Sequence, residues 1–333
     1  MSISYSEIFG MNTIILSNQS YEVTINPDFG CQIISIRNIK KNINILKMPC
    51  DCDHDEYLHA PQHFGNAILF PPNRIAGGSY TKNGITYDFF TPQERIHEGP
   101  GCMYSHGVLR FKKFIVDGVA DNNNSVILTA SYHSDKQDRI YGDIMHDFIC
   151  TITIEVNDSG VYQNISIKNT DDDILPVGTG FHTAFLLPND GTSKRPDYRI
   201  IMSSGEHIEL DSHTLPTGKF MPLKSPCRTD GILPFEHIED EHTTNVPLTI
   251  DGKPFYGAII KNTRTNNNIY FETSSNFMFW MLWNNRALSD YICIEPMSWM
   301  INAPNINLPD EVTGYNQLNP DEDIDYTLHF YTD

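Results

Sequence analysis

Apolar residues recur at every second position along much of this chain, which is the period of a β-strand with one buried face. The clearest run covers residues 148–156, whose apolar positions are Phe148, Cys150, Ile152, Ile154 and Val156. The four residues after it, Asn157-Asp158-Ser159-Gly160, are typical of a turn, and a second strand-like run covers residues 161–167. We therefore predict a β-hairpin here.

A second hairpin is predicted at Asn83-Gly84, which lies between the strand-like residues 78–82 and 85–89. Asn-Gly favours a tight type I′ turn because both central residues need positive φ. No long window has a helical period with capping residues, so we expect few helices, all of them short. Further strands are predicted at residues 13–16, 32–36, 126–132, 255–261, 269–273 and 277–283.

Many short strands separated by Gly, Pro and Asn favour an all-β sandwich or barrel. No linker rich in Gly, Ser or Pro, and no repeat of fixed period, interrupts residues 1–333. We therefore predict one large antiparallel β-sandwich domain over the whole chain. The polar, acidic segment 230–245 is interpreted as a loop or excursion from that domain.

The composition is that of a globular protein with an acidic surface. Hydrophobic residues make up 40% and aromatic residues 11% of the 333 positions, enough for a sizeable core. The chain has 23 Lys and Arg against 42 Asp and Glu, a formal net charge of −19. Such a surface repels phosphate backbones and anionic lipids, so we expect neither nucleic acid nor a membrane surface as a partner.

Targeting and cysteine patterns predict a cytoplasmic protein. No stretch approaches the roughly 18 apolar residues of a membrane span, and residues 1–9 lack the basic and apolar regions of a secretory signal. The seven cysteines are odd in number and scattered, unlike a disulfide framework. We therefore predict reduced thiols in a reducing compartment.

One cysteine-containing segment resembles a metal cluster. Cys50, Cys52 and His54 lie close together, with His59 and His63 a few residues further on. Thiolate and imidazole ligands that gather in this way can bind zinc. However, there is no second matched pair, and the spacing fits no known ligand pattern. A polar surface loop is therefore the preferred interpretation, and no metal site is predicted.

Ionisable residues accompany tight-turn residues in three short segments, 105–107, 178–185 and 292–296. In the last, an apolar run leads into Glu295. A carboxylate on a buried strand face is costly unless it is hydrogen-bonded or functional. Burial also raises a carboxyl pKa toward neutrality, which suits a general base. Taken singly, a lone His in a strand is more often structural than functional. For Glu295, a surface or salt-bridged Glu at a strand end is an equally good interpretation.

Several segments, taken in order, resemble the aldose 1-epimerase family. They run from about residue 10 to the C-terminus, so the resemblance covers nearly the whole chain. It implies a galactose mutarotase-like β-sandwich that interconverts the α and β anomers of a hexose by acid–base ring opening and closure. The matching segments are Asn73-Arg74-Ile75 with the Asn83-Gly84 hairpin, His106-Gly107 with Arg110, Phe181-His182-Thr183-Ala184-Phe185, Pro216-Thr217-Gly218, and Glu295-Pro296 with Asn302.

The resemblance also implies roles for individual residues. Glu295 is the expected base for the anomeric hydroxyl, and His182 is the expected acid for the ring oxygen. His106, Arg74 and Asn73 are expected to bind the sugar. We expect these side chains to converge on one concave face of the sandwich. The implied partner is a monosaccharide, and no metal, nucleotide or redox cofactor is required.

The chain departs from the family pattern at several positions. Thr183 stands where the family usually has Pro after the His, which affects the strand end and not the acid. Asp240, within the divergent stretch 238–243, is the candidate for the family's sugar-binding Asp. Trp280 and Trp283 are expected either near the sugar or in the core.

Two alternative functions remain. One is a hexose 6-phosphate 1-epimerase, which needs a basic cluster; Arg110, Lys112 and Lys113 are the nearby candidates. The other is a non-catalytic carbohydrate-binding module of the same fold, although the presence of both His182 and Glu295 argues against it. The negative net charge and the absence of a Gly-rich phosphate loop favour a neutral hexose. A serine-hydrolase elbow, Gly-x-Ser-x-Gly, is also absent.

Overall fold

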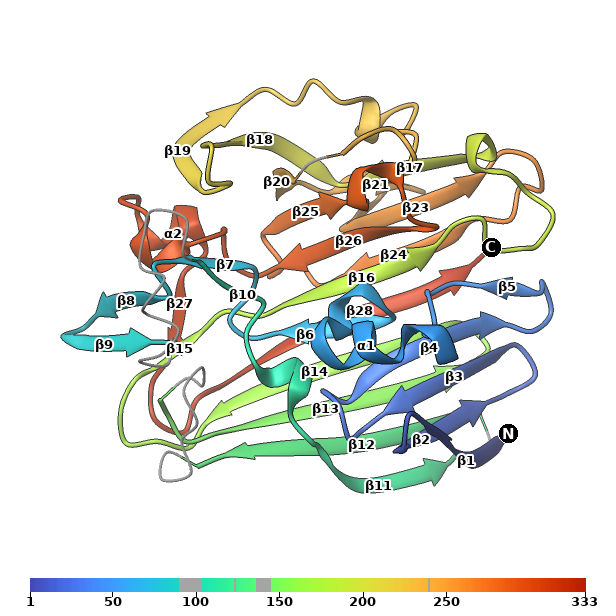
Figure 1. Cartoon of the computed structure of the whole chain (residues 1–333), viewed down its shortest axis with the longest axis horizontal. Coiled ribbons are helices and arrows are strands. Elements are labelled where there is room, and N and C mark those ends of the chain that lie inside the picture. Colours follow the sequence, from blue (N-terminus) through green and yellow to red (C-terminus); the bar gives the residue numbers. More distant parts are fainter. Residues whose placement is uncertain (90–102, 123, 136–144, 239) are drawn as a thin grey trace.

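The fold is a sandwich of two large antiparallel sheets (Figure 1). The structure is a computed structural model that describes residues 1–333 except 90–102, 123, 136–144 and 239. The larger sheet runs, in spatial order, through β1(Ser2–Ile8), β2(Met11–Ser17), β3(Tyr21–Asn26), β4(Gln32–Asn38), β6(Asn66–Leu69), β16(Gly180–Leu186), β26(Tyr291–Met297), β25(Phe279–Trp283), β20(Glu241–Asn245), β18(Ser204–Leu210) and β19(Pro216–Met221), and β5(Ile43–Asn44) pairs with β4.

The smaller sheet covers one face of the larger one. It runs, in spatial order, through β11(Ile115–Asp121), β12(Ser125–Ser134), β13(Phe148–Asn157), β14(Gly160–Asn169), β28(Asp323–Thr332), β24(Ile269–Thr273), β23(Gly257–Asn262) and β17(Tyr198–Met202). Four two-stranded ribbons also occur in the described chain: β7(Arg74–Ala76) with β10(Met103–Ser105), β8(Ser79–Lys82) with β9(Ile85–Asp88), β15(Leu175–Val177) with β27(Asn316–Leu318), and β21(Leu248–Ile250) with β22(Lys253–Phe255).

The helices of the described residues are short. They are α1(His54–His59), α2(Asp310–Thr313) and the 3₁₀ turns η1(Asp51–Asp53), η2(Pro61–His63), η4(Leu109–Phe111), η5(Arg195–Asp197), η6(Pro226–Arg228), η7(Asn285–Ala287) and η8(Ala303–Asn305). Across the described ranges, no helix has both the length and the apolar character that a bilayer crossing requires.

Side chains from both sheets form one hydrophobic core. Phe271 of β24, in the smaller sheet, lies 5.4 Å from the ring of Phe185 on β16 and 6.3 Å from that of Trp280 on β25. These contacts bury three large aromatic side chains between the layers, which strongly favours association of the sheets. One domain over residues 1–333 remains our prediction.

The predicted all-β class with few short helices is confirmed. The run 148–156 is β13, and it pairs with β14 through the predicted turn. At the second hairpin, Asn83 and Gly84 have φ of 54° and 78°, as an Asn-Gly turn of this kind requires. The run 255–261 is divided between β22 and β23, because Tyr256 interrupts it.

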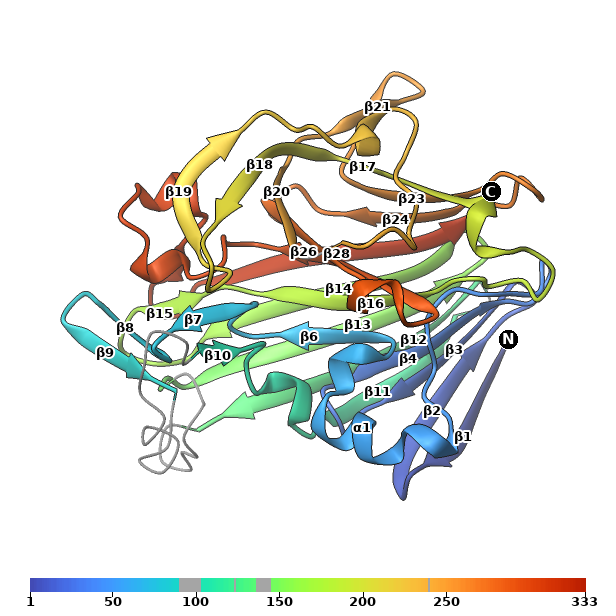
Figure 2. The same ribbon diagram turned by 45° about the horizontal axis from the view of Figure 1, so that its top comes forward.

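The loop prediction for residues 230–245 is wrong at its C-terminal end. Residues 241–245 form β20, which pairs with β25 on one side and β18 on the other. The strand contains the buried polar residues His242 and Thr243, so it lacks an apolar signature. Figures 1 and 2 show β18, β19 and β20 at one end of the larger sheet, where they extend beyond its central strands.

Candidate active site

Glu295 and His182 face each other on the central strands of the larger sheet. Strand β26 pairs with β16 in a register that sets Thr183 opposite Ile294. Ile294 points into the core of the sandwich, so alternation places Glu295 on the opposite face of the sheet. The Glu295 Oε1 atom lies 3.2 Å from Nε2 of His182. Both side chains are buried, with residue exposures of 1% and 4%.

Asn73 and His106 complete this inner cluster. The Asn73 amide donates to Oε2 of Glu295 at 3.5 Å, and the backbone N–H of His106 donates to the Asn73 carbonyl at 2.7 Å. The His106 ring stands edge-on to His182, with 5.3 Å between centroids. A Cβ at Gly107 would lie 2.0 Å from the carbonyl oxygen of Phe70. Only glycine therefore allows the backbone after His106 to approach so closely.

Arg74 and Asp240 form a second charged pair. Arg74 Nη2 donates to Oδ2 of Asp240 at 2.9 Å, and Nη1 donates to the carbonyl of Thr214 at 3.4 Å. Asn302 holds the strand that carries Arg74: its backbone N–H donates to the Arg74 carbonyl at 2.9 Å, and its side-chain oxygen accepts from the N–H of Ala76 at 3.0 Å. The six residues selected from the sequence are thus linked by contacts; their roles remain predictions.

The electrostatic environment shifts the protonation of the Glu295–His182 pair. Burial raises the pKa of Glu295 well above its usual value; Asp240 adds to this rise, while Arg74 and Asn73 oppose it. Burial lowers the pKa of His182 well below its usual value, and the charge of His63 lowers it further. Both shifts favour uncharged side chains. A carboxylic acid next to a neutral imidazole holds one shared proton.

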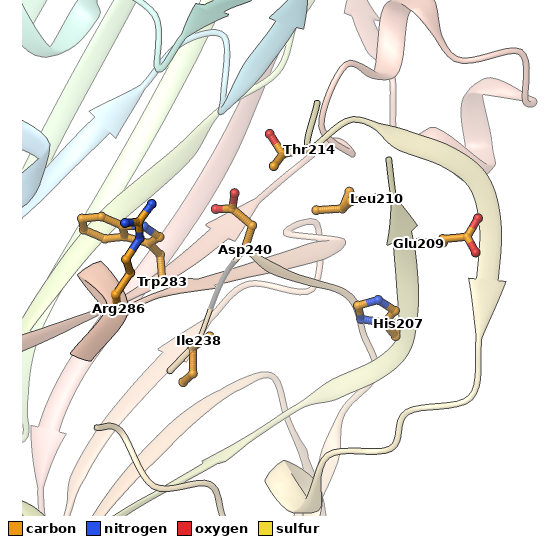
Figure 3. A pocket seen from close by; sticks show the side chains of 8 residues that line it. All are labelled: His207, Glu209, Leu210, Thr214, Ile238, Asp240, Trp283 and Arg286. Atoms are coloured by element: carbon orange, nitrogen blue, oxygen red, sulfur yellow. The ribbon is translucent and has the colours of Figure 1, made fainter. Parts of the chain in front are cut away.

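A cavity of about 490 Å³ adjoins this cluster (Figure 3). Figure 3 shows Trp283 and Arg286 on one side, Asp240 near the middle, and His207 and Glu209 on the other side. Glu295 and His182 lie beside this lining and do not form part of it. Trp283 connects the cavity lining with the Glu295–His182 pair, because its ring centroid is 6.1 Å from that of His182. The lining residues are His207, Glu209, Leu210, Thr214, Ile238, Asp240, Trp283 and Arg286.

His63 lies beside the site, although its sequence context indicates a polar surface loop. Its ring stacks on Trp283 at a centroid distance of 5.5 Å and lies 6.3 Å from His182. Nδ1 of His63 is 2.7 Å from Oε1 of Glu56. The turn η2 brings His63 to the site by packing beside β16. This is a tertiary contact, so no local pattern could have predicted it.

The two tryptophans and Thr183 have distinct places. Trp280 is buried in the core and donates to Oγ of Ser203 at 3.2 Å, whereas Trp283 lines the cavity. Thr183 continues the strand β16 in place of the expected Pro and donates to the side-chain oxygen of Asn66 at 2.6 Å. The substitution therefore leaves His182 on a regular strand.

Potential metal ligands gather elsewhere. Among the described residues, one group of three such ligands lies within 4.8 Å of one another: Cys50, Cys52 and Asp53. It belongs to the turn η1 and not to the strands that carry Glu295 and His182.

Comparison with known proteins matches this architecture. Residues 12–331 match the family model for aldose 1-epimerase. The galactose mutarotase of Sus scrofa is 24% identical over 169 residues, which are 51% of this chain and 45% of that protein. The aligned region therefore spans about half of that curated relative.

Solved structures match over the full length. A galactose mutarotase-like protein from Clostridium acetobutylicum superposes with a TM-score of 0.94 at 26% identity, covering 100% of this chain and 98% of that one. A galactose 1-epimerase from Lactobacillus acidophilus superposes with a TM-score of 0.72 at 12% identity, covering 100% and 98%. At 12% identity, the likeness to the Lactobacillus acidophilus enzyme concerns the fold alone.

Proposed function

The chain belongs to the aldose 1-epimerase family, and from this premise we propose that it interconverts the α and β anomers of a neutral hexose. The supporting observation is the buried contact of 3.2 Å between Glu295 and His182. Anomer exchange needs one base and one acid at the same hemiacetal group, and these two side chains supply both.

In the proposed mechanism, the carboxylate of Glu295 removes the proton from the anomeric hydroxyl while the imidazolium of His182 protonates the ring oxygen. The C1–O5 bond breaks and leaves the open-chain aldehyde, with Glu295 protonated and His182 neutral. Rotation about C1–C2 presents the other face of the aldehyde. Ring closure then returns both protons, so no net proton is gained or lost.

The pKa shifts of Glu295 and His182 support a cycle that uses one shared proton. The pair needs one proton in every step, on His182 when the ring is closed and on Glu295 when it is open. The lowered pKa of His182 opposes uptake of a second proton, and the raised pKa of Glu295 opposes loss of the only one. Both shifts widen the pH range in which the pair holds a single proton, and a bell-shaped pH–rate profile is expected.

The surrounding polar groups would hold the sugar. Arg74 and Asp240 offer a donor and an acceptor beside the cavity, and Asn73 donates toward Glu295. Among the described residues, buried Nδ1 of His106 and buried Oδ1 of Asn73 have no hydrogen-bond partner. Because an unpaired buried polar atom is costly, these two atoms are the natural partners of sugar hydroxyls.

Polarimetry tests the proposal. Freshly dissolved α-glucose or α-galactose is followed with and without the protein, and the spontaneous rate is subtracted. Faster decay with either sugar is expected. If wild type accelerates the decay of no common aldose, the epimerase proposal fails and a carbohydrate-binding module is the better interpretation.

Arg110 favours hexose 6-phosphates as a second candidate substrate. Its guanidinium stacks on Phe111 and donates to the carbonyl of Ser105 at 3.4 Å, but its buried Nε atom has no hydrogen-bond partner within the part of the chain that the structure describes. Burial lowers its pKa to about 10. Such a cation attracts an anionic group. Of the other two basic candidates, Lys113 is paired with Asp28 at 2.6 Å.

Calorimetric titration with glucose, galactose and glucose 6-phosphate separates the two substrates. Tighter binding of the neutral sugars is expected, given the net charge of −19. Tighter binding of glucose 6-phosphate, lost in Arg110→Met, would instead establish the phosphorylated substrate.

A cytoplasmic location is also part of the proposal. The six cysteines that the structure describes are all unpaired; the seventh, Cys102, lies outside the described residues. Free thiols of this kind suit a reducing compartment.

A further inference from the structure

The turn η1 brings two thiols and a carboxylate to one point on the surface. Sγ of Cys50 and Sγ of Cys52 are 2.7 Å apart, and Sγ of Cys52 is 3.8 Å from Oδ1 of Asp53. Both cysteines are exposed and Asp53 is half-buried. The other described cysteines, Cys31, Cys150, Cys227 and Cys293, are buried. This is therefore a solvent-accessible cluster of thiols in a part of the chain that the proposed sugar chemistry does not use.

The turn is held by its own hydrogen bond. The backbone N–H of Cys50 donates to Oδ2 of Asp53 at 2.9 Å. It caps the 3₁₀ turn over residues 51–53, which the backbone N–H of Asp53 closes by donating to the Cys50 carbonyl at 2.8 Å. The second carboxylate oxygen of Asp53 remains directed toward the sulfur of Cys52. The three ligand atoms are thus brought together before any ion binds.

The local charge favours a cation. Asp51, Asp53, Asp55 and Glu56 lie within six residues of sequence; Asp55 contacts His54 at 2.9 Å and Glu56 contacts His63 at 2.7 Å. The nearby cation, Lys47, is bonded to Asp290 at 3.0 Å. Two thiols that lose their protons here would add further negative charge. A bound metal ion would compensate the negative charge of the two thiolates directly.

We propose that Cys50, Cys52 and Asp53 bind one thiophilic metal ion such as Zn²⁺, with two sulfur ligands, one carboxylate oxygen and water in the fourth position. This departs from the interpretation of the segment as a plain surface loop. Mixed sulfur and oxygen ligands suit zinc better than magnesium or calcium. The proton of each thiol passes to solvent as its metal–sulfur bond forms.

The geometry requires only a small movement. Two sulfurs that bind one tetrahedral ion at roughly 2.3 Å lie about 3.8 Å apart. Cys50 and Cys52 must therefore separate by about 1 Å from their present 2.7 Å. Because both side chains are exposed, rotation about their Cα–Cβ bonds achieves this without repacking the core.

Zinc titration of the full-length, untagged, reduced and metal-free chain tests the site, with a colorimetric chelator as competitor. Wild type is expected to bind one Zn²⁺ that the double variant Cys50→Ser, Cys52→Ser does not bind. The loss of affinity should be at least about 100-fold, since loss of outer partners alone costs roughly 10–100-fold. Cd²⁺ should produce thiolate-to-metal absorption in wild type and none in the double variant.

A matched pair of variants separates coordination from general charge. Asp53→Asn removes a carboxylate ligand and should weaken zinc binding by at least about tenfold. Asp51→Asn removes the same charge from the same turn and should change zinc affinity by less than about twofold. Circular dichroism should show that all variants fold, because the altered side chains are outside the core.

Three results would overturn the proposal. The double variant could bind Zn²⁺ as tightly as wild type. Asp51→Asn and Asp53→Asn could lose affinity equally, which would indicate diffuse charge attraction. Finally, the reduced chain could fail to bind zinc while glutathione disulfide oxidises Cys50 and Cys52 to an intrachain disulfide, which would make the pair a redox couple.

Discussion

Two acid-containing pairs lie side by side in the candidate site and differ in how they are solvated. Glu295 and His182 are almost completely buried, whereas Asp240 lines the cavity and meets Arg74 at 2.9 Å. Arginine stays charged in proteins, so the second pair always contains a cation. In the first pair, burial favours the uncharged form of both partners. Glu295 and His182, here called the dry pair, are therefore suited to moving a proton. Arg74 and Asp240, here called the cavity pair, are suited to binding hydroxyl groups.

The largest expected effect comes from removing the carboxyl of the dry pair. Glu295→Gln should keep the fold and sugar binding, because the amide is nearly isosteric. Turnover should fall by on the order of 10²–10⁴-fold, the usual contribution of one positioned proton-transfer group. Polarimetry with freshly dissolved α-galactose measures the rate, and calorimetry measures binding.

Two comparisons sharpen that result. Glu241→Gln alters another Glu of the same sheet, on β20, which β25 separates from β26. Glu241 is paired with His207 at 3.2 Å, and the change should alter turnover by less than about twofold. The double variant Glu295→Gln, His182→Asn should lose far less than the product of the two single losses, because acid and base act as a unit. Full activity in Glu295→Gln would mean that another group is the base.

A smaller effect is expected at the cavity pair. Asp240→Asn should mainly raise KM, because it weakens the acceptor for sugar hydroxyls and leaves Arg74 without its charged partner. The loss in kcat/KM should be roughly tenfold, as for one hydrogen bond to a charged group. Steady-state polarimetry at several sugar concentrations separates KM from kcat.

The same variant has a pH signature. Asp240 contributes to the raised pKa of Glu295. Removing the charge of Asp240 lowers the pKa of Glu295, so Glu295 and His182 lose their shared proton at lower pH. The alkaline limb of the kcat/KM profile therefore moves to lower pH. A fall in kcat with unchanged KM and unchanged pH profile would contradict the assignment of Asp240 to binding.

The two pairs also differ in how far the sequence predicted them. Alternation over residues 148–156 was enough to predict β13, because each buried position is visible locally. The strand β20 was not predicted, because His242 is buried there although polar. Its neighbours β25 and β18 come from distant parts of the chain. Asp240, just before β20, was correspondingly harder to select than Glu295, which directly follows the apolar residues Ile292-Cys293-Ile294 of β26.

His63 marks the limit of what a sequence pattern conveys. It follows a segment of exposed acidic and cysteine residues and has no periodic apolar neighbours. Its contact with Trp283 depends on the packing of η2 beside β16 and on the return of β25 to the same sheet. Such a contact depends on three segments far apart in sequence.

The smallest expected effect concerns this residue. His63 lies between Glu56 and His182, and its positive charge lowers the pKa of His182. His63→Gln removes that charge, so the pKa of His182 rises and the pair accepts its second, inhibitory proton at higher pH. The acid limb of kcat/KM should therefore move to higher pH by less than about one unit, while the plateau rate changes little.

His59→Gln is the matched control for this shift. His59 lies on α1, four residues before His63, and its exposed ring bonds only to the carbonyl of Asp55 at 2.7 Å among the described contacts. The variant His59→Gln should leave the pH profile of kcat/KM unchanged. If His63→Gln raises KM without moving the acid limb, His63 acts only as packing beneath Trp283. If it moves the limb and leaves KM unchanged, its charge tunes His182, and the dry pair is then influenced from the solvent side through Glu56 as well as from the cavity through Asp240.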